Sequence, residues 1–374
     1  MKILMLLSKE FCNDPRVNKE AKALVESGHE VTVVMWDRHG KHLLEEDSNK
    51  VKVIRIRNSL LMKVLHIDLI RNPFWWRAAY KKGFELCKTK RFCFDVVHCH
   101  DLDTLPAGVW LKKKFNVKLV YDAHEIFGYM IARNMPNILV KIVFWMEKRL
   151  LRHVDHIITV ADTVEEYLKS ICDKPITVVM NCKDLIGTTY SFPKTDLFTV
   201  SYIGVLHKNR MFPEIVDTIG SIKNVRFIIA GKKENLYEDV KKRCELYDNV
   251  EFLGTIPFNE VIPRTLICNV VVCMINPNDK NNRIGLANKQ FEAMVCGRPI
   301  IVSQGTYAGR MTQDLHCGLT VQYNEASLKQ AIVTLRDDKR LCEELGKNAL
   351  KAAIEYNWGK QEKKLLDVYE SLKQ

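Results

Sequence analysis

The sequence begins with an alternation of strand and helix patterns, and this alternation limits the fold more than any other feature. Residues 2–8 form an apolar run, and Asp14-Pro15 supplies a helix N-cap followed by proline at the first helical position. Gly28 ends that helix, and residues 30–36 form a second apolar strand. A strand, a helix and a strand in this order form a βαβ unit with parallel strands. We therefore expect an α/β protein.

The alternation starts again in the second half of the chain. Residues 198–204 predict a strand, and a helix begins near Pro213. A polar segment interrupted by Gly187 and Pro193 precedes this strand, as expected for a linker. A length of 374 residues is enough for two domains of ordinary size. We predict a first domain over residues 1–182, a linker over residues 183–196 and a second domain over residues 197–356.

The cysteines and the first residues indicate the compartment. Twelve cysteines occur without a CxxC pair or a Cys/His metal spacing, which argues against a zinc site. The first residues predict a strand rather than a signal peptide, and no apolar run is long enough to cross a bilayer. We therefore expect reduced thiols and a cytoplasmic protein.

The positive charge is concentrated in one part of the chain. The net charge is +12, and residues 51–100 hold 11 Lys and Arg against 3 Asp and Glu. No nucleic-acid-binding motif accompanies this surplus, so we expect no nucleic-acid partner. Within residues 59–82, Pro73 interrupts a helical pattern and Phe74 is followed by two tryptophans. Either two helices pack on the sheet here, or this segment docks on an anionic membrane surface, such as the inner face of the cell membrane.

Candidate site residues of the first domain follow two predicted strands. His100 and Asp101 end the strand that starts at residue 95, and His124-Glu125 follows the strand at residues 118–123. Ligands of open α/β sheets bind at the carboxyl ends of the strands. Two histidines at adjacent strand ends favour function over a purely structural role. The first loop of the chain has no G-x-G-x-x-G, which argues against a nicotinamide or flavin enzyme.

The second domain contains a predicted helix whose residues suit ligand binding. Gly285-Leu286 is expected to start a helix whose free N–H groups suit a phosphate, and Lys289 adds a positive charge. Asn288 and Glu292 lie four residues apart and share one face, where Glu292 can accept two sugar hydroxyls. An ordinary helix–strand unit of an α/β domain explains the same pattern.

Three segments carry a resemblance to a known family: DVVHCHDLDTLPAG, KLVYDAHEIF and NKQFEAMVCGRPIIVS. They resemble retaining, nucleotide-sugar-dependent glycosyltransferases of family 4, and the likeness covers nearly the whole chain. The resemblance implies the GT-B fold, in which two Rossmann-like domains face each other across a cleft. It also implies that residues 357–374 form a last helix that packs back on the first domain. Asp101-Leu102-Asp103 looks like the metal motif of a different glycosyltransferase fold, and we treat it as a coincidence.

The resemblance also implies roles for single residues. Glu292 would bind the donor ribose, and His100 would contact the donor sugar. Arg210, or alternatively Lys208, would bind the diphosphate after Gly204. The nucleobase would lie near Gly254, with His124 and Glu125 toward the acceptor. Further donor-side positions are Arg16, Gly285, Leu286, Asn288 and Lys289.

The reaction that the resemblance implies is transfer of a sugar, with retention, from a nucleotide-diphosphate sugar to a hydroxyl of a glycan or lipid-linked acceptor. No cofactor or metal is expected, and the setting is surface polysaccharide or glycolipid biosynthesis. Many members have a glutamate where this chain has Ile284. Two alternatives stay open: a nucleotide-sugar epimerase or phosphorylase of the same architecture, and a non-catalytic protein that binds a nucleotide or sugar.

Overall fold

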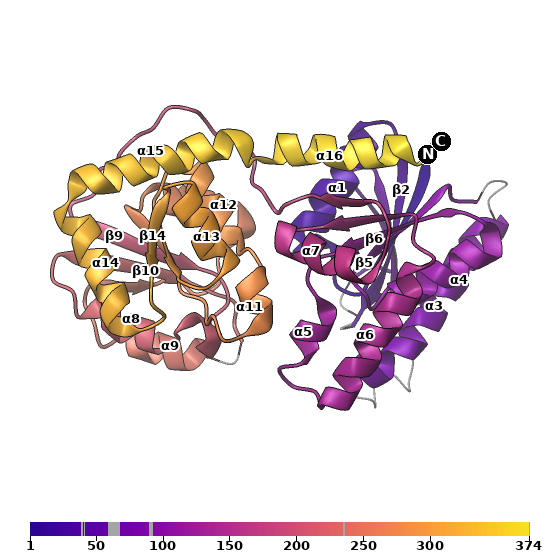
Figure 1. The fold of residues 1–374 in the computed structure, drawn as a ribbon, viewed down its shortest axis with the longest axis horizontal. Helices are drawn as coiled ribbons and strands as arrows, with labels where there is room; N and C mark the ends of the chain where they lie inside the picture. The colour runs from indigo at the N-terminus through magenta and orange to yellow at the C-terminus, as the bar shows by residue number, and fades with distance from the viewer. Residues whose placement is uncertain (39, 41, 59–67, 90–92, 235, 374) are drawn as a thin grey trace. The chain divides into compact units, whose positions relative to one another are not determined.

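The chain folds into two compact units (Figure 1). The computed structural model describes residues 1–38, 40, 42–58, 68–89, 93–234 and 236–373. Unit 1 consists of residues 1–180 together with residues 362–374, and unit 2 consists of residues 181–361. The last helix, α16 (Trp358–Ser371), therefore starts in unit 2 and ends in unit 1.

Unit 1 is built on an eight-stranded sheet that is parallel except at one edge, where β3 runs antiparallel to β4. The strands, in their order across the sheet, are β3 (Glu45–Ser48), β4 (Val51–Arg57), β2 (Glu30–Asp37), β1 (Lys2–Leu7), β5 (Val96–His100), β6 (Lys118–Ala123), β7 (His156–Thr159) and β8 (Ile176–Val178). The helical segments are η1 (Phe11–Asn13), α1 (Pro15–Glu26), α3 (Asp68–Thr89), α4 (Leu105–Phe115), α5 (Phe127–Ile131), α6 (Asn137–Leu151) and α7 (Asp162–Ile171).

Helices cover both faces of this sheet, and β5 shows how. Side chains alternate along a strand, so Val97 and Cys99 face one way and His98 and His100 the other. Gly108 of α4 lies so close to Val97 and Cys99 that a Cβ atom there would collide with the Cys99 sulfur. The opposite face of β5, with its two histidines, is covered by α1 and by the end of α16. The alternation therefore sends the histidines into the α1 side of the unit.

The predicted start of α1 is confirmed. Asp14 caps the helix, because its side chain accepts hydrogen bonds from the N–H groups of Arg16 and Val17. Pro15 is the first helical residue, and Gly28 follows the helix with φ +84°. The cap fixes the first turn of α1, which carries Arg16 into the interior of unit 1.

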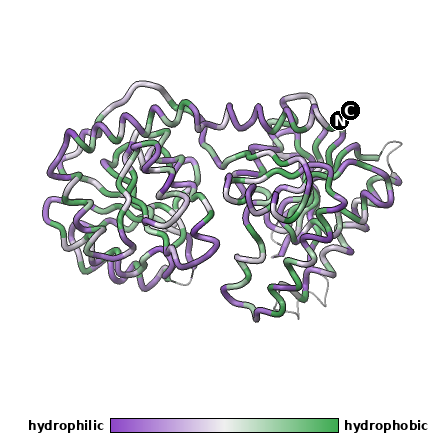
Figure 2. The backbone as a smooth tube through the Cα atoms, viewed as in Figure 1, coloured by the Kyte–Doolittle hydropathy of each residue, from purple (hydrophilic) through white to green (hydrophobic). Residues whose placement is uncertain are grey.

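Unit 2 is built on a six-stranded, all-parallel sheet. The strands, in order, are β11 (Val250–Phe252), β10 (Val225–Ala230), β9 (Phe198–Ile203), β12 (Val270–Cys273), β13 (Ile300–Ser303) and β14 (Gly318–Val321). The helical segments are η2 (Lys208–Arg210), α8 (Glu214–Gly220), α9 (Tyr237–Cys244), η3 (Phe258–Glu260), α10 (Val261–Leu266), α11 (Lys280–Ile284), α12 (Asn288–Val295), α13 (Tyr307–Asp314), α14 (Glu325–Asp337) and α15 (Lys339–Glu355). Figure 2 shows the strands of both units as mainly apolar.

Apolar side chains fill both faces of the unit 2 sheet. Val270 and Val272 of β12 join a large cluster with residues of α8, α14 and α15. Val271 and Cys273 point the other way and pack with Ala293 of α12. Buried parallel strands with helices on both faces are the Rossmann-like arrangement that the sequence predicts.

Two local predictions are wrong. Pro73 does not interrupt the helical pattern, because α3 continues through it to Thr89. The expectation that all cysteines are reduced fails at one pair, since Cys87 and Cys93 form a disulfide. The other ten cysteines are free thiols, and most of them are buried.

The aromatic residues of α3 differ in burial. Trp75 is fully buried and stacks on Trp36 with 5.6 Å between the ring centres. Trp76 is half-buried and donates a hydrogen bond from Nε1 to the Asp103 carbonyl oxygen, 2.7 Å away. Phe74 is 38% exposed. Residues 59–67, which begin the predicted membrane segment, lie outside the described residues.

Candidate active site

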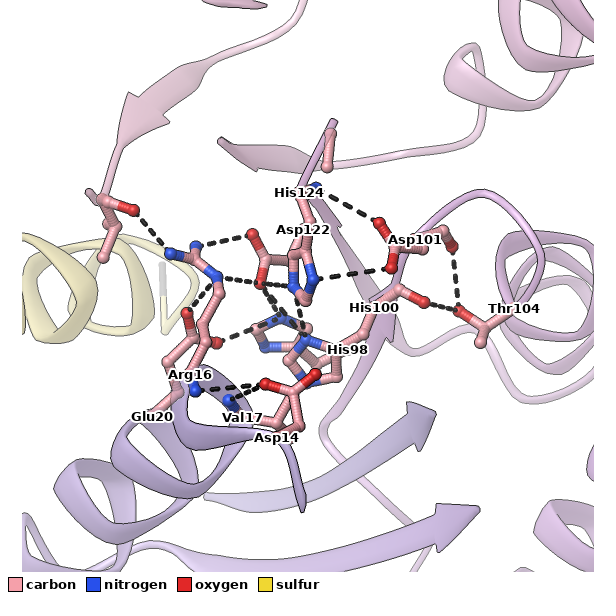
Figure 3. A network of polar contacts seen from close by, with 12 residues as sticks. Asp14, Arg16, Val17, Glu20, His98, His100, Asp101, Thr104, Asp122 and His124 are labelled. Carbon is pink, nitrogen blue, oxygen red and sulfur yellow. Dashed lines mark hydrogen bonds and ion pairs between the residues drawn. The ribbon is translucent and has the colours of Figure 1, made fainter. Parts of the chain in front are cut away.

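Charged and imidazole side chains fill the interior of unit 1 at the carboxyl ends of β5 and β6 (Figure 3). His98 and His100 stand on one face of β5, and Asp122 of β6 pairs in register with His100. Arg16 and Glu20 reach the cluster from α1. All five residues are buried, so their charges depend on partners inside the protein rather than on water.

Asp122 is the centre of this cluster. Arg16 donates to both of its carboxylate oxygens, from Nε at 3.0 Å and from Nη2 at 2.7 Å. Asp122 Oδ2 also lies 3.2 Å from His100 Nδ1 and 2.8 Å from His124 Nε2. Burial raises the pKa of Asp122, but Arg16 and then His124 outweigh it and hold this pKa well below its usual value. Asp122 is therefore ionised at neutral pH.

His124 lies between two carboxylates. Its Nε2 contacts Asp122, and its Nδ1 is 3.5 Å from Asp101 Oδ2. Burial alone would lower the pKa of His124, but Asp101 and then Asp122 raise it to about 9. His124 is thus an imidazolium at neutral pH. Lys9 Nζ, 3.4 Å from Asp101 Oδ2, adds a second positive charge beside Asp101.

His100, unlike His124, is uncharged. Burial lowers the pKa of His100, so its ring is neutral at neutral pH. Its Nδ1 faces the Asp122 carboxylate, which assigns the proton to Nδ1 and leaves Nε2 as an acceptor. Nε2 is buried and has no hydrogen-bond partner among the described residues. A neutral ring with one unpaired acceptor suits contact with a hydroxyl group.

His98 is held differently from His100. Its ring stacks on His100 with 4.3 Å between centres, and its Nδ1 is 2.6 Å from the hydroxyl of Tyr369 in α16. Burial, followed by His100, lowers the pKa of His98 well below its usual value. His98 therefore packs on His100 and contacts α16, and the donor-sugar contact of His100 stays a prediction.

The two remaining site predictions of unit 1 have different surroundings. Glu125 directly follows His124 and is partly exposed. Its charge adds to those of Asp101 and Asp103 in raising the pKa of Lys9. Arg16 is buried, and besides Asp122 its Nη1 donates to the Val179 carbonyl oxygen at 2.7 Å. A donor contact of Arg16 remains a prediction.

One group of the cluster has the composition of a metal site. Ligand atoms of Glu20, His98, His100 and Asp122 all lie within 4.8 Å of one another. Arg16 already supplies the positive charge, with Nε 3.0 Å from Glu20 Oε1. Burial raises the pKa of Glu20 to about 8, so this carboxyl is mainly protonated at neutral pH. The group therefore fits an arginine-centred network better than a cation site.

In unit 2, the helix that carries Lys289 and Glu292 begins later than the sequence predicts. Gly285 ends α11 and donates its N–H to the Asn281 carbonyl oxygen at 3.1 Å. Its N–H is therefore not available to a phosphate. Residue Leu286 also precedes α12, whose first residue is the exposed Asn288. The free N–H groups of a helix start thus belong to the first turn of α12.

Lys289 and Gly204 lie together at the end of β9. The Lys289 ammonium donates to the Ile203 carbonyl oxygen at 3.1 Å and lies 4.3 Å from the centre of the Tyr202 ring. Gly204 has φ +152°, and a Cβ atom on it would collide with Lys289 Nζ. Glycine is therefore required here both for the backbone and for the space that the ammonium occupies.

Arg210 is placed better than Lys208 for an internal contact. Lys208 is exposed, whereas Arg210 is half-buried and its Nη1 is buried without a partner among the described residues. Burial raises the pKa of Tyr202, and Lys289 and then Arg210 oppose this rise. Arg210 and Lys289 thus act on the same ring, so two positive charges converge near the end of β9.

Glu292 is buried on α12 and has a partner that the sequence did not indicate. Its Oε1 lies 3.2 Å from Nζ of Lys183. Gly254 follows β11 with φ +69°, and its carbonyl oxygen accepts the N–H of Gly231 at 2.9 Å. The predicted nucleobase position near Gly254 stays a prediction.

Sequence reasoning missed Asp122, Tyr369 and Lys183. Asp122 carries a signal in retrospect, because it lies two residues before His124 and is the only polar residue inside an otherwise apolar strand core. No sequence pattern indicates Tyr369 or Lys183, because their partners are far away in the sequence.

Two family models together match most of the chain. The model described as Glycosyltransferase Family 4 matches residues 16–185, and the model described as Glycosyl transferases group 1 matches residues 198–338. An uncharacterized glycosyltransferase of Methanocaldococcus jannaschii is 22% identical over 336 residues, which cover 88% of this chain and 90% of the relative.

Solved structures have the same fold over both units. The sucrose-phosphate synthase of Thermosynechococcus elongatus superposes with a TM-score of 0.81 at 18% identity, covering 99% of this chain and 98% of that one. Anabaena HepE in complex with UDP-glucose gives a TM-score of 0.72 at 14% identity, covering 99% of this chain and 100% of that one.

Proposed function

Because the chain belongs to the family 4 glycosyltransferases, we propose that it moves a sugar from a nucleotide-diphosphate sugar to an acceptor hydroxyl, with retention and without a metal ion. The observation that carries the donor class is the pair of positive charges of Lys289 and Arg210 near the end of β9, together with the buried carboxylate of Glu292, which follows Lys289 by three residues on α12. HepE, which has the same fold, was solved with UDP-glucose.

The donor groups have complementary partners in unit 2. In this proposal Lys289 and Arg210 bind the diphosphate, and the first turn of α12 adds its free N–H groups. Glu292 accepts the ribose hydroxyls. The charge that develops on the departing diphosphate is then neutralised by side chains already in place, which is the role that a cation has in metal-dependent transfer.

Unit 1 supplies the groups for the sugar and the acceptor. Neutral His100 accepts a hydrogen bond from a donor-sugar hydroxyl at Nε2, while Asp122 holds its other nitrogen. The His124 imidazolium and Glu125 act toward the acceptor. Retention follows if the acceptor attacks the face that the diphosphate leaves, so that the acceptor proton passes to the leaving phosphate. No protein nucleophile is needed in such a step.

The first experiment is a thermal shift assay with UDP, GDP, ADP and CMP. A ligand at a hundred times its dissociation constant stabilises the folded protein by about 2.7 kcal/mol. We expect one nucleotide to give this shift and the matching nucleotide sugar to be a donor. No shift with any of them would contradict the donor site. Product analysis without acceptor separates transferase from epimerase, since an epimerase converts the nucleotide sugar alone.

We further propose that the acceptor is lipid-linked and that α6 lies on an anionic membrane surface. Ile138, Ile142 and Trp145 of α6 are 64%, 51% and 61% exposed, and their spacing of four and three residues places them on one face of the helix. Lys141 and Arg149 on the same helix are exposed as well. Exposed apolar residues flanked by basic ones fit an anionic interface.

A hollow lies beside α6. Its volume is about 170 Å³. It is lined by Asn72, Trp76, Leu102, Asp103, Phe127, Leu139, Ile142, Val143 and Met146. No helix within the described ranges is long and apolar enough to cross a bilayer. In the aromatic stretch of α3, Trp75 is buried and Phe74 is 38% exposed, whereas α6 offers the more exposed apolar face.

A further inference from the structure

Lys183 is buried against α12 just after the chain enters unit 2. Its Nζ is 3.2 Å from Glu292 Oε1, and the two side chains are only 9% and 7% exposed. A carboxylate so far from water requires a charged or hydrogen-bonding partner. Within the described part of the chain, Lys183 is the cation paired with Glu292.

Both the side chain and the backbone of Lys183 have partners. Its ammonium lies 4.7 Å from the centre of the Phe258 ring, within the range of a cation–π contact. Its carbonyl oxygen accepts the N–H of Trp358, the first residue of α16, at 2.8 Å. The lysine is therefore a packed interior residue and not a solvated surface charge.

We propose that Lys183 is a positioning residue for the donor ribose. The ammonium binds Oε1 of Glu292 and thereby fixes the plane of the carboxylate, so that its remaining acceptor positions receive the two ribose hydroxyls. A glutamate side chain has several rotatable bonds, and ordering it before the ligand arrives removes an entropic cost from binding. This inference rests on the proposed donor site and adds a residue to it.

Two other roles of the Lys183–Glu292 pair predict different binding results. A purely structural ion pair would affect all nucleotides alike, with or without ribose hydroxyls. A competing cation, which the ribose must displace, would weaken binding in the natural protein. Only a positioning role makes the contribution of the hydroxyls depend on Lys183.

The experiment measures nucleotide affinity by calorimetry on the full chain. UDP, GDP, ADP and CDP are titrated into the natural protein, and the nucleotide that binds is then compared with its 2′,3′-dideoxy form. We expect the natural protein to bind the dideoxy form about tenfold or more weakly, as for loss of hydrogen bonds to a charged group. In Lys183→Met this ratio should fall to about twofold or less, because affinity for the ribonucleotide alone drops.

Two further variants complete the test. Lys183→Arg keeps a cation near Glu292 and should restore most of the ratio. Lys347→Met removes a lysine from an exposed ion pair with Glu343 on α15 and should leave the ratio unchanged.

The outcomes separate the inference from its premise. An unchanged ratio in Lys183→Met, with both affinities reduced alike, would assign Lys183 a structural role and overturn the inference alone. Tighter binding by Lys183→Met would identify a competitor and also overturn it. If none of the four nucleotides binds the natural protein, the donor site fails and the inference fails with it.

Discussion

The guanidinium group of Arg16 and the carboxylate of Asp122 meet through two hydrogen bonds, of 3.0 Å and 2.7 Å, in the interior of unit 1. This bidentate pair joins the first turn of α1 to the end of β6. It sets the charge of Asp122, which in turn fixes the proton on His100 and contributes to the positive charge on His124. The pair therefore links the stability of unit 1 to the ionisation of its candidate site.

Asp122→Asn should destabilise the protein strongly. The asparagine has the same shape but no charge, so Arg16 stays buried without its partner. Loss of one member of a buried ion pair costs about 3–5 kcal/mol. Urea unfolding measures this change. Glu343→Gln, in an exposed pair on α15, is the control and should change the free energy of unfolding little. Equal effects of the two substitutions would contradict the central role of Asp122.

Stability should fall as the pH rises from about 6.5 to about 9. The pKa of His124 is raised from its usual 6.5 to about 9, and the pKa of Glu20 from 4.5 to about 8. Both groups bind a proton more tightly in the folded state, so the stability they supply is present below their usual pKa and lost above it. His98 and His100 have lowered pKa values, so their titration changes the stability only below about pH 6.5.

The pH effect can be assigned with two variants. Urea unfolding at several pH values between 6.5 and 9 should give a slope that becomes shallower in His124→Gln and in Glu20→Gln. NMR of the histidine ring would report the pKa of His124 directly. A His124 pKa near 6.5 would refute the assigned charge state.

Lys289→Ala should lower turnover much more than stability. Removal of one pre-placed group that stabilises developing charge costs about 2.7–4 kcal/mol, or about a hundred- to a thousandfold in kcat. The lost hydrogen bond to Ile203 should cost about 1 kcal/mol of folding stability. Steady-state kinetics with the donor found by thermal shift, together with a melting curve, measures both. Turnover at the natural rate would remove Lys289 from the mechanism.

Gly204→Ala should displace the Lys289 ammonium. The new methyl group would occupy the space of Nζ, and the backbone at φ +152° is unfavourable for alanine. We expect weaker nucleotide binding and a loss of about 1–3 kcal/mol of stability. Gly187→Ala is a matched control, because a Cβ atom at Gly187 meets nothing within 4 Å. Calorimetry measures the nucleotide affinity of both variants, and urea unfolding measures their stability. Similar values for the two variants would show that the Lys289 ammonium does not need the space at Gly204.

Ile142→Glu combined with Trp145→Glu should abolish binding to anionic vesicles. Insertion of one such side chain contributes about 1.5–3 kcal/mol, so the double variant should lose at least about a hundredfold in partitioning. Sedimentation with phosphatidylglycerol vesicles measures binding, and phosphatidylcholine vesicles test the need for negative charge. Leu246→Glu is the control, because Leu246 is 73% exposed in unit 2. Vesicle binding that survives the double substitution would place the membrane surface elsewhere.

Local patterns in the sequence were sufficient for most of the fold. Asp14, Pro15 and Gly28 define α1 through contacts within a few residues, and apolar runs define the strands. The alternation along β5 also placed His98 and His100 on one face. Such features depend on neighbours in the chain, which a single sequence displays.

Two features were not predicted, and only the second depends on contacts that are distant in the sequence. The start of α12 moved from Gly285 to Asn288 because the Gly285 N–H is already used by α11. Pro73 is tolerated inside α3, where burial of Trp75 against Trp36 holds the helix in place. Local patterns carry no information on such tertiary contacts.

The partner of His98 is supplied by α16, in a part of unit 1 that is translated after all of unit 2. A ribosome that has released residues 1–180 has made both histidines of β5 but has not yet made Tyr369. Until residues 362–374 emerge, His98 Nδ1 lacks the hydroxyl that it contacts in the finished structure. The order of synthesis thus delays this contact of His98 until all of unit 2 has been made.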